Sequence, residues 1–516
     1  MRVFVIIVAV IFALLIAAGA GILWLLQDPN RYKSDIEAII RDATGFEVAL
    51  KGDLSWRLWP PVILQAEDLA FENNETRYSL ERLSVDASAR ALLSGTPELK
   101  VQSLRLAGLT MSDKRFESVT QIDVLTLADF SIGQPSPLHI EGVSAATSEA
   151  PTPFELDAII TYDDAADSLT LQDATFDAAG ATGVCQGRID ALSRSPSSDH
   201  QEGPDDLLPI DTFRAQDFDF DCTIPSYTAA DLTLEDIAVD VTNRGGLADI
   251  EVRVPEFFDG TATIAVDINA SRHDPRWKVT PDIAGANTQS VMDWLQQGLS
   301  WQAPLLFGGE FTMVGNTTEE LLGSINGGAR FDGGQGRMDI SAIKRNAATL
   351  AQLAGSAGAL GIAELPQLAS TADKVAAWPD ELDYSKLVGD WQIDGKRQSM
   401  SFSLDNLDIS ADGTVDTLTD ELDMAAKLTF QNDPTLHSFD IPDALRGVPI
   451  PVRCIGSVST PDCGLDRNAA QRLIGEVVRK NAGSKLESLV GDKLGDDAKK
   501  ALRGLGSLFG GKKDDN

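Results

Sequence analysis

The sequence lacks positive charge for its length of 516 residues. Its 43 Lys and Arg face 78 Asp and Glu, which gives a formal net charge of −35. Proteins bind nucleic acid mainly by neutralising phosphates with Lys and Arg, so the composition excludes nucleic acid as a partner. Charged residues make up 23% and aromatic residues 6%, as in a folded chain rather than an acidic disordered one.

Histidine and cysteine are also scarce. The four histidines, His139, His200, His273 and His437, lie far apart, and no HExxH, CxxC, GxSxG or Walker pattern occurs. The glycines of residues 326–338 (NGGARFDGGQGRM) do not follow phosphate-loop spacing and indicate turns between strands. We therefore expect no catalytic residues, no metal site and no cofactor.

The four cysteines fall into two pairs. Cys185 and Cys222 each lie in a strand-like patch, and Cys454 and Cys463 flank a short segment typical of a hairpin. This pattern predicts two disulfides and an oxidising compartment, where each could stabilise the fold by roughly 2–4 kcal/mol. The alternative interpretation is four buried thiols in a cytosolic chain.

Only one long apolar run is present, at residues 3–26. As a helix it would be about 36 Å long, enough to cross a hydrocarbon core of about 30 Å. We expect residues 1–27 to be an uncleaved transmembrane anchor. A cleaved signal peptide is the alternative, since residues 18–20 (AGA) match a cleavage pattern, but the run continues past them. The flanking charges do not fix the orientation.

After this run, one helical pattern leads into repeated two-residue alternation. Asp28 and Pro29 are typical of a helix start, and Gly45 ends the helical spacing. The alternation that follows predicts a mainly β fold, with antiparallel strands that share one apolar face. The representative inward-facing positions are Phe46, Val48, Leu50, Val85, Ile264, Val266, Leu422, Met424 and Leu428.

Composition divides the chain into regions. We expect a helix and sheet at residues 28–192, a flexible loop at 193–206, a middle β region at 207–285 and a C-terminal β region at 286–466 with an Ala-rich helix at 342–377. Residues 467–516 carry 11 Lys and Arg against 7 Asp and Glu, with apolar residues at helical spacing. This amphipathic tail is either a helical cap on the last strands or a contact with a membrane or partner.

Three blocks in order along the chain resemble the AsmA family. They are residues 28–73 (DPNRYKSDIEAIIRDATGFEVALKGDLSWRLWPPVILQAEDLAFEN), residues 307–344 (FGGEFTMVGNTTEELLGSINGGARFDGGQGRMDISAIK) and residues 389–430, the last followed by VPIPVRCIGSVSTPDCGLD. The cysteines are not part of the resemblance, and residues 101–286 agree only in strand pattern.

The resemblance implies a single-pass protein of the bacterial inner membrane with its body in the periplasm. It implies a role in outer-membrane biogenesis and lipid homeostasis, and a relation to bridge-like lipid-transfer proteins. An elongated, twisted sheet would then curl into an apolar groove for phospholipid acyl chains, with the tail available to the outer membrane or envelope proteins. Three alternatives stay open: a filled β-sandwich, an assembly or scaffold factor without lipid transfer, and an exported hydrolase.

Overall fold

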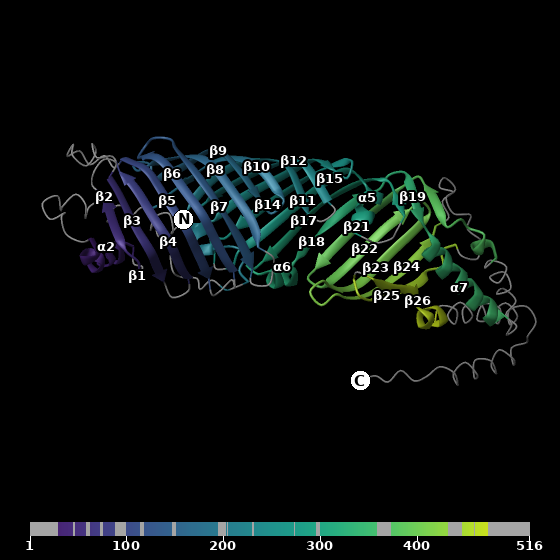
Figure 1. Cartoon of the computed structure of the whole chain (residues 1–516). Coiled ribbons are helices and arrows are strands. Elements are labelled where there is room, and N and C mark those ends of the chain that lie inside the picture. Colours follow the sequence, from purple (N-terminus) through teal and green to yellow (C-terminus); the bar gives the residue numbers. More distant parts are fainter. Residues whose placement is uncertain are drawn as a thin grey trace, which may run out of the picture. The chain divides into compact units, whose positions relative to one another are not determined.

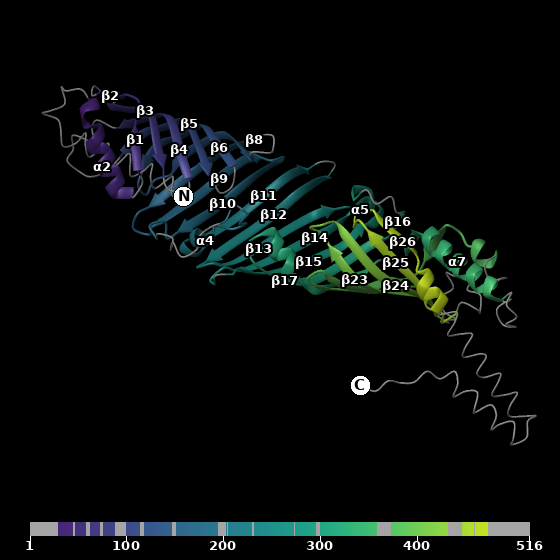
Figure 2. The same cartoon turned by 90° about the horizontal axis from the view of Figure 1, so that it is seen from below.

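The computed structural model of the chain is mainly antiparallel β-sheet with a few short helices (Figure 1; Figure 2). This confirms the prediction of a mainly β fold with antiparallel strands. The structure describes residues 29–44, 47–57, 62–72, 76–87, 100–113, 118–146, 151–194, 203, 205–229, 232–272, 274–295, 300–358, 373–431, 446–458 and 460–472. The predicted anchor (1–27) and most of the predicted tail lie outside these residues. Among the described helices, none is long and apolar enough to cross a membrane.

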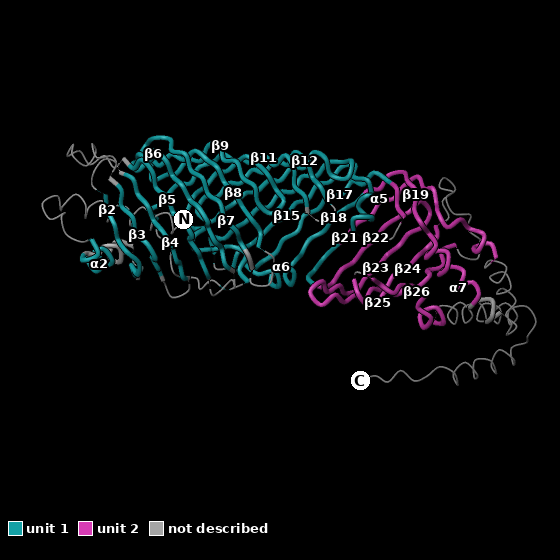
Figure 3. Tube along the Cα trace, viewed as in Figure 1, with its two compact units in different colours: residues 1–298, 303–331, 392–395 teal, residues 299–302, 332–391, 396–516 magenta. Residues whose placement is uncertain are grey.

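The chain divides into two compact units (Figure 3). Unit 1 comprises residues 1–298, 303–331 and 392–395, and unit 2 comprises residues 299–302, 332–391 and 396–516. One boundary between the units, at residues 391 and 392, falls within strand β21 (Leu387–Asp394). Each unit is described by itself.

Unit 1 is built around one long meander, in which each strand pairs antiparallel with the next strand in the sequence from β3 to β15 and then β17. Alternating apolar and polar residues with short polar turns favour this arrangement, because hairpins need only short connections. Its strands are β3 (Val62–Glu72), β4 (Thr76–Ala87), β5 (Lys100–Asp113), β6 (Ser118–Ser131), β7 (Ser136–Ala146), β8 (Thr152–Asp163), β9 (Ser168–Ala178), β10 (Ala181–Asp190), β11 (Asp217–Ala229), β12 (Leu232–Arg244), β13 (Leu247–Phe257), β14 (Gly260–Asn269), β15 (Arg276–Asn287) and β17 (Pro304–Val314).

Two short strands share the first edge of this meander. β1 (Glu47–Leu50) pairs with one half of β3 and β2 (Leu54–Arg57) pairs with the other half. Between them Gly52 approaches the β3 backbone so closely that a Cβ atom would lie 2.5 Å from the carbonyl oxygen of Glu67. Only glycine fits there without displacing the backbone, which explains the glycine in the KGD segment.

The described helices of unit 1 are short and lie at strand ends. They are the 3₁₀ helix η1 (Pro29–Tyr32), α2 (Lys33–Thr44), α4 (Ile210–Ala215), α5 (Thr288–Trp294) and α6 (Thr318–Ser324). Two of them, α5 and α6, start at side-chain caps. The Asn287 side chain accepts hydrogen bonds from two backbone N–H groups of α5, and Thr317 forms a capping box with Glu320 at α6. The remaining strand assigned here is β18 (Asn326–Asp332).

Unit 2 contains a three-stranded sheet and a second, shorter meander. The sheet consists of β16 (Trp301–Gln302), β19 (Gly336–Asp339) and β20 (Glu381–Tyr384). The meander consists of β22 (Arg397–Leu404), β23 (Leu407–Asp416), β24 (Glu421–Phe430), β25 (Ile450–Gly456) and β26 (Pro461–Leu465). Helix α7 (Ser341–Gly358) lies against β25 and β26, and residues 359–372 of the predicted Ala-rich helix lie outside the described residues.

Candidate functional site

The apolar face of unit 1 extends across many strands of its meander. Backbone register aligns one apolar residue per strand into rows that cross the meander. One row runs from β8 to β17 through Ile160, Leu171, Gly187, Phe220, Val241, Ile250, Val266, Val279 and Phe311. A neighbouring row runs from β9 to β15 through Ala174, Cys185, Cys222, Val239, Val252, Ile264 and Pro281.

The N-terminal part of this face is filled by the chain's own side chains. Leu69, Leu83, Val85, Leu106 and Ile160 belong to one cluster and are each at most 2% exposed. The cluster draws on β1 to β9, and Ile36 of α2 packs into it. These residues therefore offer no exposed apolar surface to a ligand.

Between β11 and β15 the same face is open in its middle. Val239, Ile250, Val252 and Val266 are only half-buried, and Ile264 is 37% exposed. We give the name open band to nine half-buried or exposed residues of these two rows on β11 to β15. It comprises Phe220, Cys222, Val239, Val241, Ile250, Val252, Ile264, Val266 and Val279.

Packed clusters border the open band along the strand direction. Ile237, Val254 and Ala262 form a buried cluster on one side. On the other side Ala248 and Ile268 are buried, with Phe213 of α4 packed against them. The apolar surface is thus a bounded band rather than a whole exposed sheet.

A buried asparagine fixes α4 at this border. The Asn243 Nδ2 group donates hydrogen bonds to the carbonyl oxygens of Phe213 (2.7 Å) and Gln216 (2.6 Å). Asn243 stands opposite Phe218 and Ala248, where the apolar face ends. The polar side chain at this position therefore holds the short helix that covers the end of the face.

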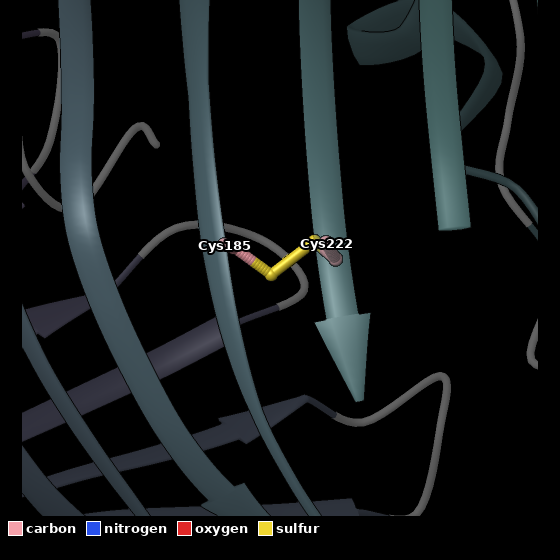
Figure 4. The surroundings of a disulfide bond; sticks show 2 residues. All are labelled: Cys185 and Cys222. Carbon is pink, nitrogen blue, oxygen red and sulfur yellow. A yellow bond between two sulfur atoms is a disulfide. The ribbon is translucent and has the colours of Figure 1, made fainter. Parts of the chain in front are cut away.

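A disulfide lies within the second row. Cys185 of β10 and Cys222 of β11 are directly opposed and joined, with their Cα atoms 4.1 Å apart (Figure 4). In unit 2, Cys454 of β25 and Cys463 of β26 are joined in the same way. Both are the pairs that the sequence predicts, and each links two neighbouring strands of an apolar face.

The opposite face of the meander is polar and carries paired charges. Arg253 binds both Asp240 and Glu251, and Lys278 lies 2.9 Å from Glu310. Asp267 stands opposite Asp249, and the hydrogen bond between the two carboxyl groups, with burial, raises the pKa of Asp267. These pairs are solvated and belong to the outer surface of the sheet.

Eight of the nine predicted lining residues lie among the described residues, and these eight fall into three groups. Val48, Leu50 and Val85 belong to the filled cluster, so the structure places them in a core and not on an open surface. Ile264 and Val266 lie in the open band. Leu422, Met424 and Leu428 share one face of β24 in unit 2, where Met424 and Leu428 are buried and Leu422 is half-buried, and Phe46 lies outside the described residues.

Sequence reasoning missed most of the open band. Val239, Ile250, Val252 and Val279 alternate with Asp240, Glu251 and similar residues, so the same periodicity could have identified them. The difference in burial between the two ends of the face leaves no periodic signal, because alternation shows which side is apolar and not whether that side is covered.

Comparison with known proteins yields one family match. The model of the AsmA family matches residues 1–127. No curated protein matches the chain. The family match together with the two disulfides indicates an extracytoplasmic envelope protein.

Proposed function

Residues 1–127 belong to the AsmA family, and on that premise we propose that this chain holds phospholipid acyl chains on the open band. It does so as a non-enzymatic, inner-membrane-anchored protein with its body in the periplasm. Its role is in outer-membrane biogenesis and envelope lipid homeostasis. Residues 1–27 would supply the anchor.

The observation that carries the proposal is the partial exposure of a continuous apolar band. Val252, Ile264 and Val266 keep apolar surface in water although they face the same way as the buried cluster. Exposed apolar area costs about 25 cal/mol per Å², and each CH₂ group of an acyl chain costs about 0.8 kcal/mol. Contact between the open band and an acyl chain removes apolar surface of both from water, and so removes both of these free-energy costs.

The size of the band suits an acyl chain. From β11 to β15 the strands are neighbours in one meander, and at a spacing of about 4.8 Å their four intervals cover about 19 Å. Half of a bilayer's hydrocarbon core is about 15 Å thick. An acyl chain with the length that it has in a bilayer therefore fits across these strands.

The filled cluster limits the proposal to a holding site. Because Val85 and Leu106 are buried by the chain itself, the apolar face at β4 and β5 is not available to lipid, and the holding site is confined to the open band on β11 to β15. A scaffold role in envelope assembly, without lipid transfer, is the second candidate, since that cluster supports a purely structural body.

A photoactivatable phospholipid tests the proposal. The full chain in mixed micelles would be irradiated, digested and analysed by mass spectrometry. We expect acyl cross-links on peptides that contain Val239, Val252, Ile264 or Val266. Cross-links restricted to residues 1–27, or to unit 2, would refute the holding site and leave the scaffold role.

A further inference from the structure

A histidine and two carboxylates meet on the polar face of unit 1, away from the open band. His139 lies on β7, and Asp157 stands directly opposite it on β8. Glu155 lies two residues before Asp157 on the same side of β8, since alternate residues of a strand face the same way. Leu138, the neighbour of His139 in sequence, packs against the filled cluster on the opposite, apolar side.

The potential ligand atoms of these side chains are close together. One from each of His139, Glu155 and Asp157 lies within 4.8 Å of the others, and His139 Nδ1 is 2.9 Å from Asp157 Oδ1. Two ligands bound to one tetrahedral zinc ion lie about 3.3 Å apart, given bonds of about 2.0 Å. Small side-chain rotations would bring all three onto one ion.

The local charge favours a divalent cation. Two carboxylates and one neutral imidazole carry a charge of about −2, which matches the charge of the ion. Glu155 stands opposite Glu141 of β7 on one side and opposite Asp177 of β9 on the other, so further carboxylates lie next to the cluster. The strands place Thr126 and Thr175 next to His139 and Asp157, and neither of these is cationic.

The ligand types select among metals. Magnesium and calcium prefer oxygen ligands alone, whereas an imidazole nitrogen with carboxylates suits zinc and other first-row divalent ions. We propose that His139, Glu155 and Asp157 form a zinc site that links β7 to β8 on the polar face. Three protein ligands leave one coordination position for water.

The site would act as a cross-strand link. The two strands are joined there only by backbone hydrogen bonds and side-chain pairing, and both disulfides lie elsewhere, on apolar faces. A bound ion that contacts only the folded state stabilises it by mass action. This role does not depend on lipid binding.

Sequence spacing conceals the site. His139 is 18 residues from Asp157, and register alone brings them together. For this reason the sequence predicts no metal site.

Cobalt and zinc titrations of the full chain in detergent test the proposal. Cobalt bound to the site should give visible absorption typical of low coordination number, and zinc should displace it with one ion per chain. His139→Gln and Asp157→Asn should each weaken zinc binding more than about tenfold. The matched control is Glu141→Gln, which removes an adjacent carboxylate outside the cluster and should leave the affinity within about twofold.

Two results would overturn the proposal. One is a zinc affinity that Glu141→Gln lowers as much as His139→Gln does, which would indicate diffuse attraction to an acidic surface. The other is the absence of one-to-one binding to the wild-type chain. Circular dichroism of each variant verifies that it is folded, and rescue of cobalt absorption in Asp157→Glu would support direct ligation.

Discussion

Asn30 pairs with the backbone of Leu54 in both directions. Its Oδ1 atom accepts from the Leu54 N–H at 3.0 Å, and its Nδ2 group donates to the Leu54 carbonyl at 3.4 Å. Glu37 of α2 similarly accepts from the Leu50 N–H at 2.7 Å. Side chains from the first helical segment thus occupy backbone groups of β1 and β2 that an edge strand would otherwise offer to another chain.

Replacing Asn30 with Ala should loosen this edge. Both hydrogen bonds are lost, and a cost of about 1–3 kcal/mol is typical when backbone groups lose their partners. Amide hydrogen exchange should accelerate at Leu54 and its neighbours while β12 to β14 keep their protection. Asn30→Asp keeps the acceptor and should show an intermediate rate at the Leu54 amide. Equal exchange in all three proteins would show that the contact does not hold the edge.

Charge on the open band should abolish lipid retention without unfolding the chain. Ile264 is 37% exposed, so Ile264→Glu can keep its carboxylate hydrated while it repels acyl chains. The measurement is phospholipid copurified per chain, together with the melting temperature.

Val184 supplies the matched control because it is 46% exposed on the polar face of β10. Val184→Glu should leave lipid content unchanged. Val85→Glu, at a residue with 0% exposure, should instead lower the melting temperature sharply or prevent folding. If Ile264→Glu and Val184→Glu retain equal lipid, the open band is not the site.

The two disulfides should differ in their contribution to stability. Their sequence separations are 37 residues for Cys185–Cys222 and 9 residues for Cys454–Cys463. Loop-closure entropy then gives about 3.8 and about 2.6 kcal/mol respectively. Double Cys→Ser variants compared by denaturant unfolding should show the larger loss for the first pair. A larger loss for the second pair would mean that native packing, and not loop length, governs the effect.

Acid should weaken the β23 end of unit 2 through Asp416. The Lys396 ammonium, 2.6 Å from the carboxylate, lowers the pKa of Asp416 from 3.8 to about 2, with smaller contributions from Thr419 and Leu418. Because the pKa is lowered in the folded state, the stabilisation is present above about pH 3.8 and is lost as the pH falls toward 2.

Lys396→Met tests this dependence. The wild-type chain should lose more stability than this variant between pH 4 and pH 2, as measured by the denaturant midpoint of unit 2. The difference should shrink in high salt because the pair is solvated. Parallel pH profiles for the two proteins would contradict the assignment.

The strands of the fold could be predicted from local patterns. Leu156 and Ile160 alternate before the DDAAD turn, and Leu169 and Leu171 alternate after it, which predicts the β8–β9 hairpin that the structure contains. The two disulfides could be predicted in the same way, because the two cysteines of each pair lie in strand-like segments that turn out to be neighbouring strands. Periodicity of two reports the direction of a side chain relative to its own strand.

Burial and distant partners could not be predicted in this way. Val85 and Ile264 have the same alternating context, yet one is fully buried and the other is exposed. The difference depends on which other strands and helices cover each part of the face. Similarly, Asn30 matches the pattern of a helix start in the sequence, and its hydrogen bonds to Leu54 depend on how η1 packs against β2.

The next-neighbour pairing of unit 1 has a consequence for biogenesis. Every strand from β4 to β15 can complete its pairing as soon as the following strand emerges, so contacts remain local even in a long sheet. A polypeptide that is exported from its N-terminal end could therefore assemble progressively, with the unpaired edge always at the newest strand. Gene duplication of a single hairpin would lengthen such a protein while leaving all earlier pairings intact.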